Sequence, residues 1–94
     1  PTITAPALDP GVLATLRAFM ASVEQAGGTA ANTGLPAGVF GKTGTAQFGS
    51  ANPPRTHAWF IGYRANLAFA VIVEGGGVGG TVAAPIAAHF LAAL

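Results

Sequence analysis

FGKTGTAQ at residues 40–47 and HAWFIGY at residues 57–63 are the two stretches that decide how this chain folds. We predict a strand over residues 39–47. Two glycines interrupt it, but glycine in a strand also marks where a ligand or another backbone comes close. We predict a second strand over residues 57–64. Because side chains alternate between the faces of a strand, one face should carry His57, Trp59, Ile61 and Tyr63 and the other Ala58, Phe60 and Gly62.

A helix is predicted ahead of the first strand, over residues 10–26. Asp9 is a suitable N-cap, and Pro10 fits the first helical position, where its missing N–H is not needed. Apolar residues then recur at helical spacing. Gly27 and Gly28 are expected to end the helix by supplying a left-handed cap.

A hairpin and a final helix are predicted after the second strand. A two-residue turn at Ala65-Asn66, with asparagine taking the positive φ, leads into a strand over residues 67–74. This strand is apolar on both faces and is therefore expected to be buried. A glycine-rich connector at residues 75–80 precedes a helix over residues 82–94. Helix, three antiparallel strands and helix make an α+β arrangement, whose two sheet edges another segment would normally pair with or cover.

Composition limits the classes of function. Hydrophobic residues make up 51% of the chain and charged residues 7%, against about 25% charged residues in ordinary soluble domains. We therefore expect another segment or subunit to cover part of the surface. A net charge of +1 gives no electrostatic case for binding nucleic acid. No cysteine is present, and no cofactor or metal is expected, because His57 and His89 lack ligand spacing. We interpret His57 as a half-buried residue at a strand end.

The connector matches the G-x-G-x-x-G pattern, which marks a dinucleotide site when it joins a strand to a helix in a βαβ unit. That fingerprint also requires a second parallel strand and an acidic residue about 20 positions further on. The sequence offers neither. We therefore interpret residues 75–80 as a flexible link between the sheet and the last helix.

The run Lys42-Thr43-Gly44-Thr45-Ala46 in a strand, followed by Trp59-Phe60-x-Gly62-Tyr63, closely resembles one known family. It is similar to the C-terminal part of the transpeptidase domain of high-molecular-weight penicillin-binding proteins, over nearly the whole chain. Such enzymes build their active site from Lys-Thr-Gly, from Ser-x-x-Lys, which carries the nucleophile, and from Ser-x-Asn. We assign the last two motifs to an upstream segment or chain. Residues 1–94 are thus interpreted as the C-terminal segment of the domain, without its nucleophile.

The resemblance implies a peptidoglycan D,D-transpeptidase that cross-links stem peptides through an acyl-serine intermediate and binds β-lactams covalently. It also implies a location at the extracytoplasmic face of the bacterial cell membrane, with an anchor upstream. A D,D-carboxypeptidase or a serine β-lactamase-like hydrolase is an alternative. A non-catalytic segment that only completes a sheet is an alternative of another class.

Lys42, Thr43, Gly44 and Thr45 are the candidate site residues. The ammonium group of Lys42 and the hydroxyls of Thr43 and Thr45 are suited to holding a substrate carboxylate. Gly44 lets an acyl group approach closely, and the Thr45 backbone N–H is a candidate donor to the developing oxyanion. The resemblance implies that Lys42 also supports proton transfer at the Ser-x-Asn serine. We expect neither Lys42 nor Thr43 to belong to the packed face of the strand.

Overall fold

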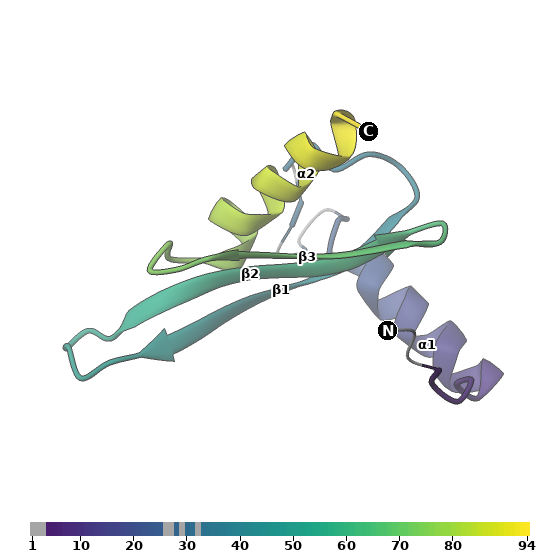
Figure 1. The fold of residues 1–94 in the computed structure, drawn as a ribbon, viewed down its shortest axis with the longest axis horizontal. Coiled ribbons are helices and arrows are strands. Elements are labelled where there is room, and N and C mark those ends of the chain that lie inside the picture. Colours follow the sequence, from purple (N-terminus) through teal and green to yellow (C-terminus); the bar gives the residue numbers. More distant parts are fainter. Residues whose placement is uncertain (1–3, 26–27, 29, 32) are drawn as a thin grey trace.

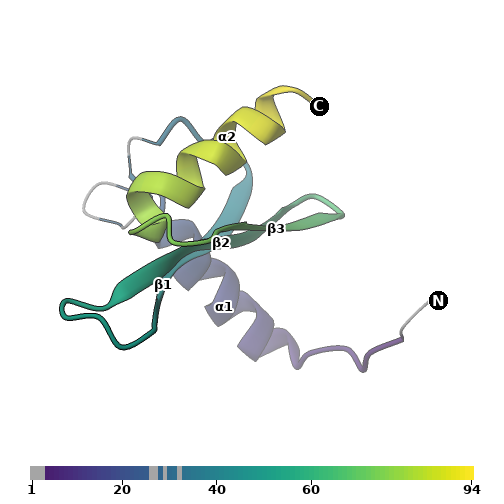
Figure 2. The same cartoon turned by 60° about the vertical axis from the view of Figure 1, so that its left-hand side comes forward.

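The sheet and its two helices are described by a computed structural model over residues 4–25, 28, 30–31 and 33–94. Three antiparallel strands lie in the order β1-β2-β3, and the two helices lie on opposite sides of the sheet (Figure 1, Figure 2). This is the predicted α+β arrangement. The elements are α1 (Pro10–Ser22), β1 (Val39–Phe48), β2 (Arg55–Arg64), β3 (Leu67–Val73), η1 (Gly79–Ala83) and α2 (Ala84–Ala92).

Helix α1 begins as predicted and ends earlier than predicted. The Asp9 carboxylate accepts hydrogen bonds from the backbone N–H groups of Gly11 and Val12, at 3.0 and 3.2 Å, which is an N-cap. The helix ends at Ser22 instead of near residue 26. Gly28 does not have a positive φ, so the predicted left-handed cap is wrong for this residue; Gly27 lies outside the described residues. A Cβ on Gly28 would collide with the Ser22 carbonyl oxygen, so close approach explains this glycine.

The register of β1 against β2 gives the sheet two different faces. Thr43 pairs with Phe60, and Lys42 pairs with Ile61. Cross-strand partners project to the same face. We call the face of Phe60 and Ala58, which η1 and α2 cover, the back face, and the face of Lys42 and Ile61 the front face. Phe60 and Ala58 are completely buried, whereas Ile61 is exposed, which confirms the predicted alternation along β2.

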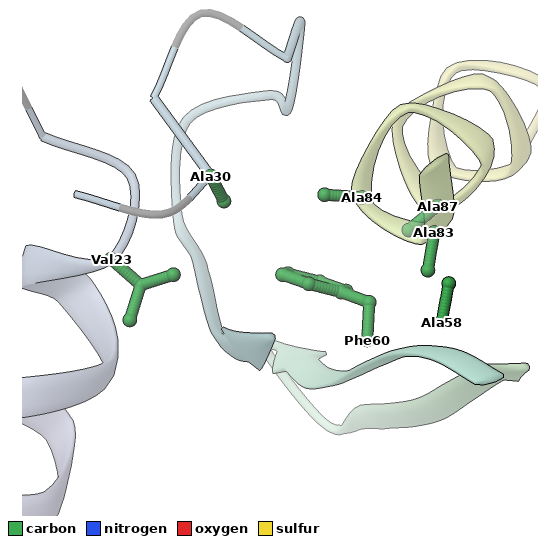
Figure 3. Close-up of a cluster of buried hydrophobic side chains, with 7 residues drawn as sticks. All are labelled: Val23, Ala30, Ala58, Phe60, Ala83, Ala84 and Ala87. Carbon is green, nitrogen blue, oxygen red and sulfur yellow. The ribbon is translucent and has the colours of Figure 1, made fainter. Parts of the chain in front are cut away.

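The core lies between the back face and α2. Phe60 is surrounded by small side chains from β2, the helices and the segment that precedes β1 (Figure 3). Alanines on η1 and α2 let the helix backbone come close to the sheet. The phenyl ring of Phe60 also lies over Gly41, where an added Cβ would collide with it. Packing, not ligand access, therefore explains this glycine. The buried cluster comprises Val23, Ala30, Ala58, Phe60, Ala83, Ala84 and Ala87.

Strand β3 departs from the prediction that it is buried on both faces. Its alternate residues Phe69, Val71 and Val73 are half-buried on the back face, and the others are exposed. The reason is its position at the sheet edge, where α2 covers only one side. The hairpin before β3 occurs as predicted, but Ala65 takes the positive φ, 53°, and Asn66 does not.

The last helix begins in a wide turn. The Ala84 N–H bonds to the Gly79 carbonyl five residues back, which is one π-type turn, and α2 then continues to Ala92. Pro85 lies in the first turn of α2, as expected for a residue without an N–H. Within the part of the chain that the structure describes, no helix is long and apolar enough to cross a membrane.

Candidate active site

Lys42 lies in the middle of β1, exposed on the front face. Its Nζ donates a hydrogen bond to the carbonyl oxygen of Thr43, at 2.8 Å. This partner is neutral, so the contact leaves the positive charge of the ammonium group uncompensated. The side chain is therefore held close to the backbone of its own strand while its charge remains available to an anion in solution.

Thr43 and Thr45 project to the face opposite Lys42. Their partners across the β1–β2 pairing are Phe60 and Ala58, both of which are buried on the back face. Thr43 is half-buried there, so the expectation that it avoids the packed face is wrong; strand alternation requires it once Lys42 faces the front. The Thr45 hydroxyl oxygen accepts a hydrogen bond from the Gly79 N–H, at 3.2 Å.

The backbone of β1 alternates in the direction of its polar groups. A Cβ built on Gly79 lies 2.5 Å from both the Gly44 and Trp59 carbonyl oxygens and 2.9 Å from the Gly44 nitrogen. All three atoms therefore lie close to one another, which is possible only if the N–H and C=O groups of Gly44 point toward β2. In an antiparallel pair, the backbone N–H and C=O groups of the residues before and after such a residue point away from the partner strand. The N–H and C=O groups of Thr43 and Thr45 therefore point to the outer edge of the sheet.

The four predicted site residues thus converge on one strand edge. β1 is the outer strand of the described sheet. Along its edge, the Lys42 ammonium lies on one side, the two threonine side chains lie on the other, and the Thr45 N–H points outward between them. Gly44 has no side chain to obstruct a ligand at this edge. A Cβ added to Gly44 would lie 3.4 Å from the Cβ of Trp59. An extended ligand lying along this edge would reach all three kinds of group.

His57 occupies the far end of β2, away from Lys42. Its Nδ1 accepts a hydrogen bond from the Gly75 N–H, at 2.9 Å. Its ring stacks on Phe48, with centroids 3.9 Å apart, and the Arg55 guanidinium lies 5.2 Å from the centroid of the same Phe48 ring. The interpretation of His57 as a half-buried residue at a strand end is confirmed.

The glycine-rich connector is fastened to the sheet, contrary to the prediction of a flexible link. The Gly77 N–H donates to the Thr56 carbonyl at 3.3 Å, and the Thr56 hydroxyl donates to the Gly77 carbonyl at 2.9 Å. The bonds to His57 and Thr45 anchor its two ends. Sequence reasoning missed these anchors because a bond from a loop N–H to a distant side chain leaves no periodic pattern.

The loop between β1 and β2 contains a triplet that the sequence interpretation overlooked. Ser50-Ala51-Asn52 has the letters of a Ser-x-Asn motif. It is exposed and follows the end of β1. The six residue steps from Lys42 to Phe48 span about 20 Å of strand, so Ser50 lies far beyond the reach of the Lys42 ammonium. The position of this triplet does not fit a serine that would exchange a proton with Lys42.

The described residues form an open surface. They enclose no pocket, and they contain no cluster of three histidine or acidic side chains that could hold a metal ion.

In the comparisons, no curated protein and no solved structure matches the chain significantly. The sequence model of one protein family, described as "Penicillin binding protein transpeptidase domain", matches residues 2–92. These residues include every helix and strand described above. The chain therefore belongs to the transpeptidase domain family of penicillin-binding proteins.

Proposed function

We propose that this chain forms one wall of the active site of a peptidoglycan D,D-transpeptidase that works through an acyl-serine intermediate. One observation carries the proposal: the edge of β1 presents the Lys42 ammonium beside the outward-pointing N–H of Thr45. An exposed cation and a backbone donor on one strand edge suit a substrate that is an extended peptide with a terminal carboxylate.

In this mechanism a stem peptide ending in D-Ala-D-Ala lies along the edge of β1. Its terminal carboxylate binds the Lys42 ammonium and a threonine hydroxyl. A serine from another segment attacks the penultimate carbonyl carbon, and the oxygen of that carbonyl takes the negative charge opposite the Thr45 N–H. One such donor contributes about 3 kcal/mol to transition-state stabilisation. The terminal D-Ala leaves as the C–N bond breaks, and an acceptor amine then displaces the serine from the ester.

We further propose that the segment carrying Ser-x-x-Lys covers the front face. Trp59 on β2 and Ile72 on β3 pair across the strands and are 36% and 44% exposed. The apolar side of α1 is open as well, with Phe19 66% exposed. Neighbouring exposed apolar side chains, as at Trp59 and Ile72, mark an interface. A segment docked here would lie beside Lys42, where a nucleophile is required.

The location proposed for the active protein is the extracytoplasmic face of the bacterial cell membrane, since the peptidoglycan substrate is there. The experiment is performed on the parent protein that contains this chain. It is incubated with a D-Ala-D-Ala stem peptide, with and without an acceptor amine, and the products are separated by mass. Cross-linked product together with released D-Ala supports transpeptidation.

Two other outcomes would replace this proposal. Release of D-Ala with water as the sole acceptor would indicate the carboxypeptidase or hydrolase alternative. An absence of acyl transfer from any serine would indicate a segment that only completes a sheet. Arg64→Ala is the matched control for Lys42→Ala, because Arg64 is an exposed cation at the end of the neighbouring strand β2; only the Lys42 variant should slow the reaction.

A further inference from the structure

The connector between β3 and α2 passes directly behind the candidate site. It bonds to β2 through Thr56 and His57 and to β1 through Gly79, the first residue of η1. Gly79 is buried. It is therefore a point of contact between the C-terminal helix region and the candidate site strand, and it helps to hold that strand in place.

Gly79 fits against bare backbone. At this pair Gly44 has no side chain and that of Trp59 belongs to the front face, so the back face carries only main-chain atoms here. A Cβ on Gly79 would lie 2.5 Å from the carbonyl oxygens of both residues. Ordinary carbon–oxygen contacts begin at about 3.3 Å, so even an alanine would force the connector and the strands apart.

A hydrogen bond from Gly79 fixes the side chain of Thr45. The Gly79 N–H donates to the Thr45 hydroxyl oxygen, at 3.2 Å. Here the hydroxyl is an acceptor and keeps its own proton, which it can donate to a substrate carboxylate. Gly79 therefore limits the rotation of the Thr45 side chain and, through its backbone contact, also fixes the position of the peptide that joins Gly44 to Thr45.

We propose that Gly79 is a positioning residue for acyl transfer, acting through Thr45 and through the Gly44–Thr45 peptide. The inference rests on the function proposed above, in which the Thr45 N–H stabilises the oxyanion. Catalytic donors act only when they are held in place, and a displacement of about 1 Å can cost about a hundredfold in rate. The close contact at Gly79 makes the donor position sensitive to a single methyl group.

The test measures second-order acylation by a fluorescent penicillin in the parent protein. Gly79→Ala is expected to lower the acylation rate constant by about a hundredfold. Thr81→Ala is the matched control, because Thr81 is an exposed residue of the same turn whose hydroxyl donates to the local Val78 carbonyl, at 3.3 Å. This variant should acylate at the wild-type rate. The rate constant is taken from the time course of the molecules that become labelled. Unfolded protein lowers the final amount of label but does not change this rate constant.

A series at Thr45 separates positioning from a general loss of structure. Thr45→Ser keeps the acceptor oxygen and should lose less than Thr45→Val, which removes the acceptor and should lose about fivefold, the worth of one neutral hydrogen bond. Combined with Gly79→Ala, Thr45→Val should cost less than the product of the two separate losses, because both changes act on the same contact.

Two results would overturn the inference: Gly79→Ala labelling at the wild-type rate constant, or Thr45→Val matching the wild type. If Gly79→Ala gives no soluble protein, the rate constant of Thr45→Val decides whether the inference stands. These results differ from a failure of the proposed function, in which the wild-type protein would acylate at no serine and both proposals would be withdrawn together.

Discussion

The two faces of the sheet differ more than their sequences suggest. Both are apolar, but the back face encloses Phe60 completely beneath α2, while the front face leaves Trp59 and Ile61 exposed beside Lys42. The back face holds the chain together, and the front face is available for another group. The candidate site lies at the edge of β1, where the two faces meet, so changes on the back should act on stability and changes on the front on chemistry.

The largest expected effect is the loss of the back-face core. Phe60→Ala should destabilise the domain by about 3–5 kcal/mol, because it leaves a cavity surrounded by alanines that have little side chain with which to fill it. Denaturant unfolding measures this effect. Leu67→Ala, at an exposed position of β3, is the control and should cost about 0.5 kcal/mol or less. Equal losses from the two variants would remove the distinction between the faces.

On the front face, Lys42→Ala should leave unfolding unchanged and slow acylation by penicillin about ten- to a hundredfold. The expected loss is that of one charge-assisted hydrogen bond, about 1.5–3 kcal/mol. Thr43→Val should slow acylation less, because it removes a neutral hydroxyl. Both are measured as second-order rate constants, with melting curves on the same samples. A stable Lys42→Ala variant that acylates normally would exclude Lys42 from the site.

Two glycines of β1 offer a finer comparison. Gly41 and Gly44 look equivalent in sequence, but an added Cβ meets the Phe60 ring at Gly41 and lies at an ordinary distance from Trp59 at Gly44. Gly41→Ala should therefore cost about 1–3 kcal/mol of stability through overpacking. Gly44→Ala should change stability much less and instead hinder the approach of the acyl group. Unfolding and acylation are measured on both variants. If Gly44→Ala lost stability and Gly41→Ala lost only acylation rate, the assignment of the two faces would be contradicted.

The smallest effect is expected at Glu24, just beyond α1. Burial raises the pKa of its carboxyl above the ordinary value of 4.5, and its Oε1 has no hydrogen-bond partner among the described residues. The folded state then holds the proton more tightly than the unfolded state, so stability should fall as the pH rises from 4.5 through the folded pKa. Glu24→Gln should abolish that fall and melt slightly higher at neutral pH. Glu74→Gln, at an exposed position, is the control for melting curves recorded against pH.

Local patterns were enough to predict the three strands and the two faces of β2. The Asp9-Pro10 start and the alternation along β2 follow from rules that act within a few residues, and both are confirmed. The candidate strand was also predicted correctly, because Lys42 and its neighbours form a run that one family shares. The match of that family to residues 2–92 confirms the resemblance.

The features that were missed depend on contacts between distant parts of the chain. β3 is apolar on both faces, but its burial depends on what covers each face, and α2 covers only one. The connector looks flexible because it is rich in glycine, yet its glycines allow its N–H groups to reach Thr45 and His57. Ser50-Ala51-Asn52 has the letters of a motif, but its position in the loop separates it from Lys42. Sequence spacing does not reveal such distances.

The most direct test of the central claim is to map the penicillin adduct in the parent protein by mass spectrometry of its peptides. We predict a single labelled serine in a Ser-x-x-Lys motif outside residues 1–94, with labelling strongly slowed by Lys42→Ala and unaffected by Arg64→Ala. An adduct on any serine or threonine within residues 1–94, or labelling that is indifferent to Lys42, would contradict the claim that this chain supplies one wall of the site.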